Sequence, residues 1–435
     1  MVTTGIIVVI ILLTAFFLGL HVAVTLGLTA MVVGVVSFGP QMIDMCGHIP
    51  WNVVNSQTLP VVPLFFIMGE ILLRSGITED LYEAINKWLY KLPGGMLYTN
   101  IASCAMFSAI SGSSVATAAT IGSVALPAML SRGYNETITV GSISAGGTLG
   151  ILIPPSILII MYGLLAEVSI GQLYIAAIIP GAIMALTFCG VILLLSFVIP
   201  NFAPKYAGPI IPWIEKIVGL LALAPVIMLF LLVLGTIYLG IATVMESAAF
   251  GASGAFFIAL FKGRVNARML RDVFVSTACN TGMVIFILIG AFLLQFVLTF
   301  LGIPAALSDW VIGLELSPLM LIAGICVMYF ILGMFMDSLA MLITTVPILV
   351  KMLTDMNIDL IWFGIITVIM MEMALITPPV GMNLFVIQGV RMRVSFGSEN
   401  KRMADTYIGA TPFVFAMITV LIIVIAYPQL TLCLL

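Results

Sequence analysis

Four stretches of the sequence place glycine, proline and hydroxyl residues inside otherwise apolar segments: Ser111–Ser114, Gly147–Ser156, Gly333–Ser338 and Ala374–Pro379. The second and fourth contain Pro-Pro pairs, which should interrupt a helix because proline lacks an N–H donor and clashes with the preceding turn. Free carbonyls at a helix C-terminus can hold a cation, and free N–H groups at an N-terminus can hold a carboxylate. Oxygen ligands without a carboxylate cluster suit Na⁺ better than Ca²⁺. The alternative is that these small residues only pack helices together.

Acidic residues inside the apolar segments are further candidates, because a charge at membrane depth is costly and usually functional. Asp337 is the most prominent of them, with three possible roles: binding the ion, contacting the substrate or capping a helix. Glu246 and Glu372 are expected to brace helices rather than bind ions. Glu70 and Glu167 are expected near the solvated ends of spans.

The composition places these residues in a membrane. The chain has 435 residues, of which 63% are hydrophobic and only 8% charged, whereas a soluble domain carries about 25% charged residues. Apolar runs of about 20 residues recur along the whole chain, as expected for membrane-spanning helices. The expected spans are 3–19, 22–38, 60–76, 137–164, 173–199, 217–235, 240–261, 279–302, 360–389 and 406–427, with two longer regions, 99–130 and 317–350, that break at glycine in their middle.

The distribution of basic residues favours re-entrant hairpins for the two longer regions. With two hairpins and an external N-terminus, all of the 15 Lys and Arg residues except Lys351 face the cytoplasm. If both regions were single crossings, the basic residues would divide almost evenly between the two sides. The first hairpin is therefore expected to enter from the cytoplasm and the second from outside.

Opposite entry of two hairpins suggests an inverted repeat, and the sequence matches itself at a nearly constant offset. Gly69 pairs with Gly290, the Gly112 hairpin with the Gly333 hairpin, and the Pro-Pro pair at 154–155 with the pair at 378–379. The predicted fold is an all-α polytopic membrane protein with two opposed hairpins and two broken helices. Its predicted parts are scaffold helices (1–60), a first repeat (61–172; hairpin 99–130, broken helix 137–164), connecting scaffold helices (173–278, with a basic cytoplasmic stretch at 262–271), a second repeat (279–390; hairpin 317–350, broken helix 360–389) and a cytoplasmic loop with a last helix (391–435).

Four segments in order, SAISGSSVATAATIGSVALPAM, GGTLGILIPPS, the stretch from Gly240 to Ala249 and ITPPVGMNLFV, resemble the large membrane subunit of tripartite ATP-independent periplasmic (TRAP) transporters. The resemblance covers nearly the whole chain. One departure is that Thr243-Val244-Met245-Glu246 replaces the family's Thr-Pro-Thr-Glu run, so the glutamate is kept and the helix-breaking proline is absent.

The resemblance implies an elevator-type secondary transporter that couples uptake of an organic acid, such as a C4-dicarboxylate or sialic acid, to a Na⁺ gradient. It implies a soluble periplasmic protein that delivers the substrate, and a small membrane subunit of about four helices, expected here as a separate chain. The location implied is the bacterial inner membrane, with a periplasmic N-terminus. No nucleic-acid partner is expected.

The family's ion ligands are largely backbone carbonyls, and the resemblance carries them to two sets of positions. The first Na⁺ site is expected at Ser111, Gly112, Ser113, Gly150, Ile153 and Pro155, and the repeat places the second at Gly333, Met336, Asp337, Ala374, Thr377 and Pro379. Candidates for the substrate cavity are Ser114, Ser156 and Asn383.

Two other readings compete with this one. A stand-alone Na⁺/carboxylate symporter or exchanger of related fold would need no binding protein. An intramembrane serine protease is suggested by Gly251-Ala252-Ser253-Gly254, but a serine nucleophile needs a nearby base. The only histidines, His21 and His48, lie far upstream, so the chain is not expected to be an enzyme.

Overall fold

The computed structural model describes residues 7, 8, 10–12, 14, 15, 18–199, 202–204, 211–394 and 401–435. All regular structure within these residues is helical. The predicted span at 3–19 lies only partly within them. The helices are α2 (Val22–Phe38), α3 (Gln41–Val54), α4 (Val61–Arg74), α5 (Ile77–Leu89), α6 (Met96–Ser111), α7 (Ser114–Leu130), α8 (Glu136–Leu152), α9 (Ile157–Ala166), α10 (Ile170–Val198), α11 (Trp213–Tyr238), α12 (Val244–Phe261), α13 (Ala267–Phe300), α14 (Ile303–Gly313), α15 (Pro318–Gly333), α16 (Ser338–Asp355), α17 (Leu360–Ile376), α18 (Met382–Arg393), α19 (Met403–Ala426) and α20 (Gln429–Leu432).

Most of the predicted spans correspond to helices, and the all-helical membrane fold is confirmed. Five described helices are long and apolar enough to cross a membrane alone, or up to eight if each bent pair is one span. Four of the described helices were not predicted: α3, α5, α14 and the short α20. In addition, α13 begins at Ala267 instead of 279, so the predicted basic stretch at 262–271 runs into this helix.

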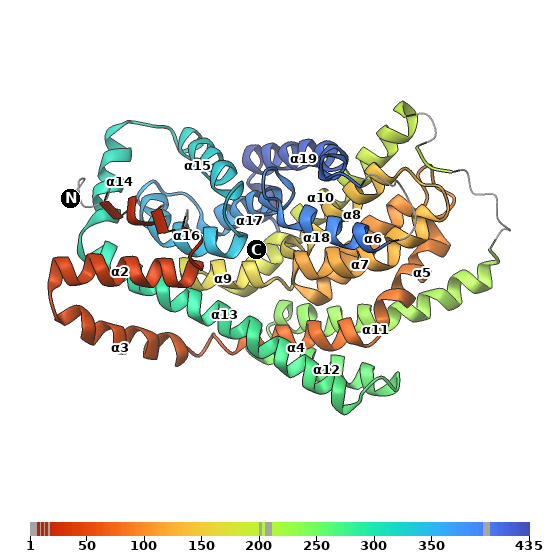
Figure 1. Ribbon diagram of the computed structural model, residues 1–435, viewed down its shortest axis with the longest axis horizontal. Coiled ribbons are helices and arrows are strands. Elements are labelled where there is room, and N and C mark those ends of the chain that lie inside the picture. Colours follow the sequence, from red (N-terminus) through yellow and green to blue (C-terminus); the bar gives the residue numbers. More distant parts are fainter. Residues whose placement is uncertain are drawn as a thin grey trace.

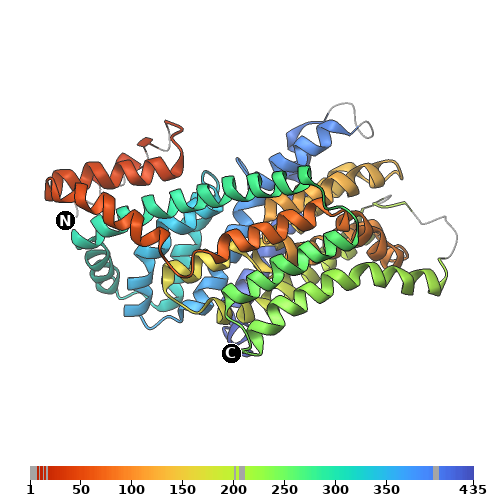
Figure 2. The ribbon, with the colours of Figure 1, turned by 90° about the horizontal axis from the view of Figure 1, so that it is seen from below.

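The helices form two groups that pack side by side. In one group α12 packs on α4 and α11, and α13 packs on α2, α3 and α4. Figures 1 and 2 show this group along one side of the molecule. The other group contains α6–α10 and α15–α20, in which α8 contacts α6, α7, α17 and α19. Both hairpins and both broken helices therefore lie in the second group, while α5 joins the groups through α6 and α11.

Packing between the repeats is reciprocal. The second arm of the first hairpin, α7, packs on α18, and the second arm of the second hairpin, α16, packs on α9. Each arm thus covers the second half of the other repeat's broken helix. Similarly, α2 packs on α13 and α12 packs on α4. The helices α2 and α12 therefore also correspond to each other in the repeat. Figure 1 shows the hairpins in opposite halves of the long axis, with α9, α17 and α18 between them.

Candidate functional site

The tip of the first hairpin is a two-residue break between α6 and α7. Gly112 has a φ of 57°, in the left-handed region that favours glycine. Ser113 is extended, and its side chain caps α7 by accepting a hydrogen bond from the Ala116 N–H. The sequence placed this break at Ser111–Ser114, and the structure agrees.

The first broken helix stops at Leu152 and restarts at Ile157, where the side chain of Ser156 caps α9. The predicted interruption began at Gly147, but the structure corrects this because residues 147–152 remain helical. Pro154 removes the N–H that a continuous helix would direct at the Gly150 carbonyl, and Pro155 does the same for Ile151. The Ser156 hydroxyl donates to the Ile151 oxygen at 2.5 Å.

The hairpin tip lies directly on this break. The Ile157 N–H donates to the Gly112 oxygen at 3.5 Å. A Cβ added to Gly112 would lie 2.9 Å from the Pro155 oxygen, and one added to Gly150 would lie 2.8 Å from the Ser113 carbonyl. The structure therefore brings together four of the six positions expected for the first Na⁺ site.

The hydroxyl groups and the Ser113 carbonyl at the first tip already have hydrogen-bond partners within the tip. The Ser113 oxygen accepts hydrogen bonds from the Thr117 N–H at 3.0 Å and the Thr117 hydroxyl at 2.8 Å. The Ser111 hydroxyl lies 2.7 Å from the Thr117 hydroxyl. Because the Ser113 carbonyl has these partners and the Gly150 carbonyl loses its helical one, Gly150 is the better placed of the two to bind a cation.

The second unit repeats this construction with a longer tip. α15 ends at Gly333, and Asp337 caps α16 by accepting a hydrogen bond from the Leu339 N–H at 3.1 Å. Asp337 thus occupies the capping position that Ser113 has in the first hairpin. Of its three predicted roles, the cap is present in the structure, and ion binding and substrate contact stay predictions.

The second tip also contacts its broken helix. A Cβ added to Gly333 would lie 2.5 Å from the Ala374 Cβ, and the Ser338 hydroxyl donates to the Met371 oxygen at 3.4 Å. Ala374 is still helical, and the interruption spans Thr377–Gly381. Pro378 removes the helical N–H partner of the Ala374 carbonyl, as Pro154 does at Gly150. The Ala374 oxygen instead accepts a long hydrogen bond from the Thr377 N–H at 3.5 Å.

The other predicted positions have definite places. The Thr377 hydroxyl donates to the Met373 oxygen at 2.6 Å, and the Pro379 oxygen accepts from the Tyr407 hydroxyl at 2.7 Å. Ile153 caps the end of α8, and Met336 is half-buried at the second tip. Their binding of Na⁺ stays a prediction.

The three candidates for the substrate cavity are all buried. The Asn383 amide donates to the Ser114 hydroxyl at 2.7 Å and to the Ser144 oxygen at 3.2 Å, so α18 of the second repeat is tied to α7 and α8 of the first. Ser156 caps α9, where its hydroxyl accepts a hydrogen bond from the Ile159 N–H.

The other acids differ in their surroundings. Both carboxylate oxygens of Glu372 are buried on α17 and have no hydrogen-bond partner among the described residues. Glu246 is exposed and forms a capping box with Thr243 at the start of α12, so the helix begins there without the family's proline. Glu70 is paired with Arg74 at 3.0 Å rather than freely solvated, and Glu167 is exposed.

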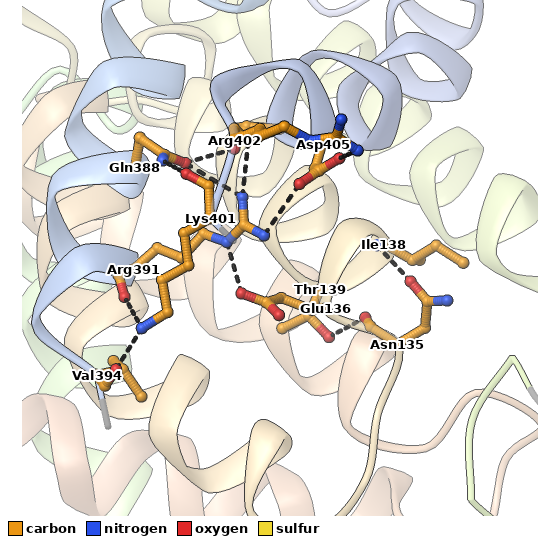
Figure 3. A network of polar contacts seen from close by, with 11 residues as sticks. Asn135, Glu136, Ile138, Thr139, Gln388, Arg391, Val394, Lys401, Arg402 and Asp405 are labelled. Atoms are coloured by element: carbon orange, nitrogen blue, oxygen red, sulfur yellow. Dashed lines mark hydrogen bonds and ion pairs between the residues drawn. The ribbon is translucent and has the colours of Figure 1, made fainter. Parts of the chain in front are cut away.

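Sequence reasoning missed a buried ion cluster at the far end of α18 (Figure 3). The Arg391 side chain is 1% exposed and lies 2.6 Å from the Glu136 carboxylate and 3.4 Å from that of Asp405. It therefore joins the start of α8, the end of α18 and the start of α19. The available signal was an acid placed directly after the N-cap Asn135, since it needs a cationic partner if it is buried.

The chain is similar to known proteins along nearly its whole length. A family model described as "Tripartite ATP-independent periplasmic transporter, DctM component" matches residues 7–430. The chain is 32% identical over 398 residues to the C4-dicarboxylate TRAP transporter large permease protein DctM of Pseudomonas aeruginosa, covering 91% of this chain and 90% of the relative. It is 28% identical over 386 residues to the sialic acid TRAP transporter large permease protein SiaM of Vibrio cholerae, covering 88% and 87%.

Among solved structures, the fold is similar to the crystal structure of the Alcanivorax borkumensis YdaH transporter. The TM-score is 0.64 at 15% identity, and the match covers 88% of this chain and 87% of that one. At this identity the likeness concerns the fold alone.

Proposed function

This chain belongs to the family of DctM components of TRAP transporters, and we propose that it imports an organic acid by Na⁺-coupled alternating access. As a large TRAP permease it is a multi-pass membrane protein. The named relatives handle C4-dicarboxylates and sialic acid, and we assign this chain a solute of the same carboxylate class. Its proposed partners are a small membrane subunit and a periplasmic binding protein, in a bacterial inner membrane with a periplasmic N-terminus.

The observation that carries the proposal is the meeting of four helix ends at the first break. The C-terminal ends of α6 and α8 and the N-terminal ends of α7 and α9 come together where Gly112 contacts Pro155 and Gly150 contacts Ser113. The C-terminal ends favour a cation and the N-terminal ends favour an anion. A Na⁺ ion near the Gly150 carbonyl would therefore strengthen carboxylate binding at the neighbouring N-termini.

The second break gives the same arrangement a fixed negative charge through Asp337. A cation near Asp337 and the Ala374 carbonyl would offset this charge, which is costly to leave unpaired in a buried position. Because each tip is held against its broken helix, each of the two cations would fix one tip–break contact. The hairpins and broken helices would then move as one body past the group containing α4, α12 and α13, as in an elevator.

Reconstitution tests the proposal. Proteoliposomes containing this chain with its small subunit should take up an organic acid only when an inward Na⁺ gradient and the loaded binding protein are both present. Replacing Na⁺ with K⁺ should abolish uptake. Full uptake of free substrate by this chain alone would instead identify a stand-alone symporter, and uptake unaffected by Na⁺ would remove the coupling. A thermal-shift ligand screen on the binding protein would identify the solute.

A further inference from the structure

A large hollow lies between the two groups of helices, away from the hairpin tips. It has a volume of about 780 Å³ and is lined by the end of α3, the loop that follows it, the end of α9 and the C-terminal part of α13. Its walls thus come from both groups that the proposed elevator would move past each other. A volume in this range fits a small organic molecule.

The polar residues of this cavity are free of protein partners. Asn52 lies near the end of α3 and Ser56 in the loop that follows it, and Gln295 and Thr299 lie one turn apart on α13. Within the part of the chain that the structure describes, none of these four side chains makes a hydrogen bond to protein. They are neutral amides and hydroxyls, which can donate to a carboxylate or hold water. A purely lipid-filled crevice would leave them unsatisfied.

Glu167 supplies the only acidic group in this lining and stands at the C-terminal end of α9. It is exposed and has a φ of 55°, which is uncommon for a residue other than glycine. Both its carboxylate and the end of the helix dipole favour a cation. The cavity therefore offers oxygen groups for a cation on one wall and hydrogen-bond donors for an acid on the other.

The cavity opens in the half of the molecule opposite to the basic residues. Its α13 residues lie from Leu288 to Phe300, whereas Arg268 and Arg271 lie at the other end of this 34-residue helix. A helix of that length extends about 50 Å. Because basic residues concentrate on the cytoplasmic side, the cavity faces outward.

A much smaller hollow of about 50 Å³ lies in the inner half, between α4 and the first hairpin, next to Ser111, Ser113 and Asn280. The repeat relates Gln295 to Arg74, and the Arg74 guanidinium is held by Glu70 at 3.0 Å and by Ser276 at 3.1 Å. It likewise relates the exposed Glu167 to the buried Arg391. Since an inverted repeat makes the two halves interchangeable in principle, one open and one closed half are the mark of a single transport state.

We infer that the cavity between α3, α9 and α13 is the water-filled outer vestibule through which Na⁺ and the organic acid enter, and that the structure is the outward-open state with the inner path closed. This inference rests on the proposed transport function. It adds the side of the membrane to which the transporter is open, the place where solute enters and the residues that line this entrance. Asn52, Ser56, Gln295 and Thr299 receive the acid, and Glu167 receives the cation.

Thiol labelling of the complete complex in right-side-out vesicles tests this. Gln295→Cys lines the outer cavity, and Leu73→Cys lines the small inner gap. A membrane-impermeant thiol reagent added outside should modify Gln295→Cys at least about tenfold faster than Leu73→Cys, as expected when one of two states predominates. Peptide mass spectrometry separates these thiols from the six native cysteines. Na⁺ with solute should slow the labelling.

A variant with two new cysteines can hold the inner gap closed and serves as a control for the labelling experiment. Leu73 on α4 and Ala116 on α7 line the same inner gap, so a short bifunctional thiol reagent should join cysteines at these positions. The joined protein should keep its outer labelling at Gln295→Cys and lose uptake. Asn52→Cys gives a second outer position if Gln295→Cys does not fold.

Three outcomes would overturn the inference. Labelling of the outer positions only by a lipid-soluble maleimide would make the cavity a lipid crevice. Faster labelling of Leu73→Cys, measured in inside-out vesicles, would make the structure inward-open. Unchanged uptake after crosslinking would disconnect the inner gap from transport. If the unmodified complex showed no Na⁺-driven uptake, the proposed function would be wrong. The labelling pattern would still show whether the cavity is a water-filled vestibule.

Discussion

At the first break α7 is capped by Ser113, and the carbonyl freed by proline belongs to Gly150. At the second break α16 is capped by Asp337, and the carbonyl that loses its helical donor belongs to Ala374, which accepts only a long hydrogen bond from the Thr377 N–H at 3.5 Å. The tips differ as well: two residues separate the helices of the first hairpin, whereas Met334–Asp337 separate those of the second, with Phe335 exposed. The first unit is neutral and closely packed. The second carries a charge and has a longer tip.

This difference indicates that the two units make different contributions. In the first, the backbones approach so closely that glycine is required on both sides, at Gly112 and Gly150. In the second, glycine is needed only at Gly333, since Ala374 already carries a Cβ. We expect the first unit to depend on backbone geometry and the second on the Asp337 carboxylate.

The largest expected effect comes from the far ends of the two broken helices. Arg391→Met should lower the free energy of unfolding by about 3 kcal/mol, because Glu136 and Asp405 lose their buried partner. Glu167→Gln, at the corresponding end of α9, should change it by less than about 0.5 kcal/mol because the side chain is exposed. Thermal unfolding in detergent measures both, with the exposed Arg268→Ala at the start of α13 as a control. Equal changes in the free energy of unfolding for the two variants would contradict the difference between the buried Arg391 and the exposed Glu167.

Gly150→Ala tests the close packing of the first unit. The new Cβ would meet the Ser113 backbone at 2.8 Å, so we expect a loss of about 2 kcal/mol in stability, typical of overpacking, and a strong loss of uptake. Gly190→Ala is the matched control, since a Cβ there meets nothing within 4 Å. Ala374→Gly, at the equivalent position of the second unit, should be mild in comparison. If Gly150→Ala were also mild, the first tip would not need this contact.

Asp337→Asn tests the charge of the second unit while keeping an N-cap side chain. The Na⁺ concentration for half-maximal uptake should rise at least about tenfold, equivalent to about 1.4 kcal/mol of ion binding. Ser113→Ala should change this Na⁺ concentration less, because the Ser113 side chain at the corresponding cap is neutral. Folding is checked by thermal unfolding without Na⁺. Asp337→Asn with unchanged Na⁺ dependence would leave Asp337 as a cap only.

The smallest effect is expected at the bridge between the repeats. Asn383→Ala removes the hydrogen bonds to Ser114 and to the Ser144 oxygen and should lower the free energy of unfolding by about 1 kcal/mol. Asn55→Ala, in the exposed loop after α3, is the control and should be neutral. A Na⁺-induced rise in melting temperature that persists in Asn383→Ala would show that the bridge is not part of ion binding.

Much of the fold could be predicted from the sequence because its signals are local. Glycine at 112 and 333 and the Pro-Pro pairs marked the breaks, and the repeat matched them. The loss of a helical donor at Gly150 and Ala374 also follows from the prolines four residues later. The short helix α5 was missed because hydropathy detects apolar runs, whereas α5 is amphipathic and stabilised by pairs such as Glu83–Lys87.

The rest of the candidate site depends on which segments distant in sequence come together. The Arg391 cluster joins residues more than 250 positions apart, and the bridge from Asn383 to Ser114 spans 269. Neither spacing leaves a periodic signal. The outer cavity is a still clearer case, since its walls belong to three segments that are far apart in the sequence.

The reciprocal packing of the hairpins has a consequence for how the protein is made. α9 ends at Ala166 but is covered by α16, which begins at Ser338. About 170 residues must be synthesised in between, which takes roughly 10–35 s at typical elongation rates. During that interval the nascent first half holds a hairpin and a broken helix without the surface that buries them. A chain truncated before Ser338 should therefore be a substrate for membrane quality control, even though every element of its first repeat is present.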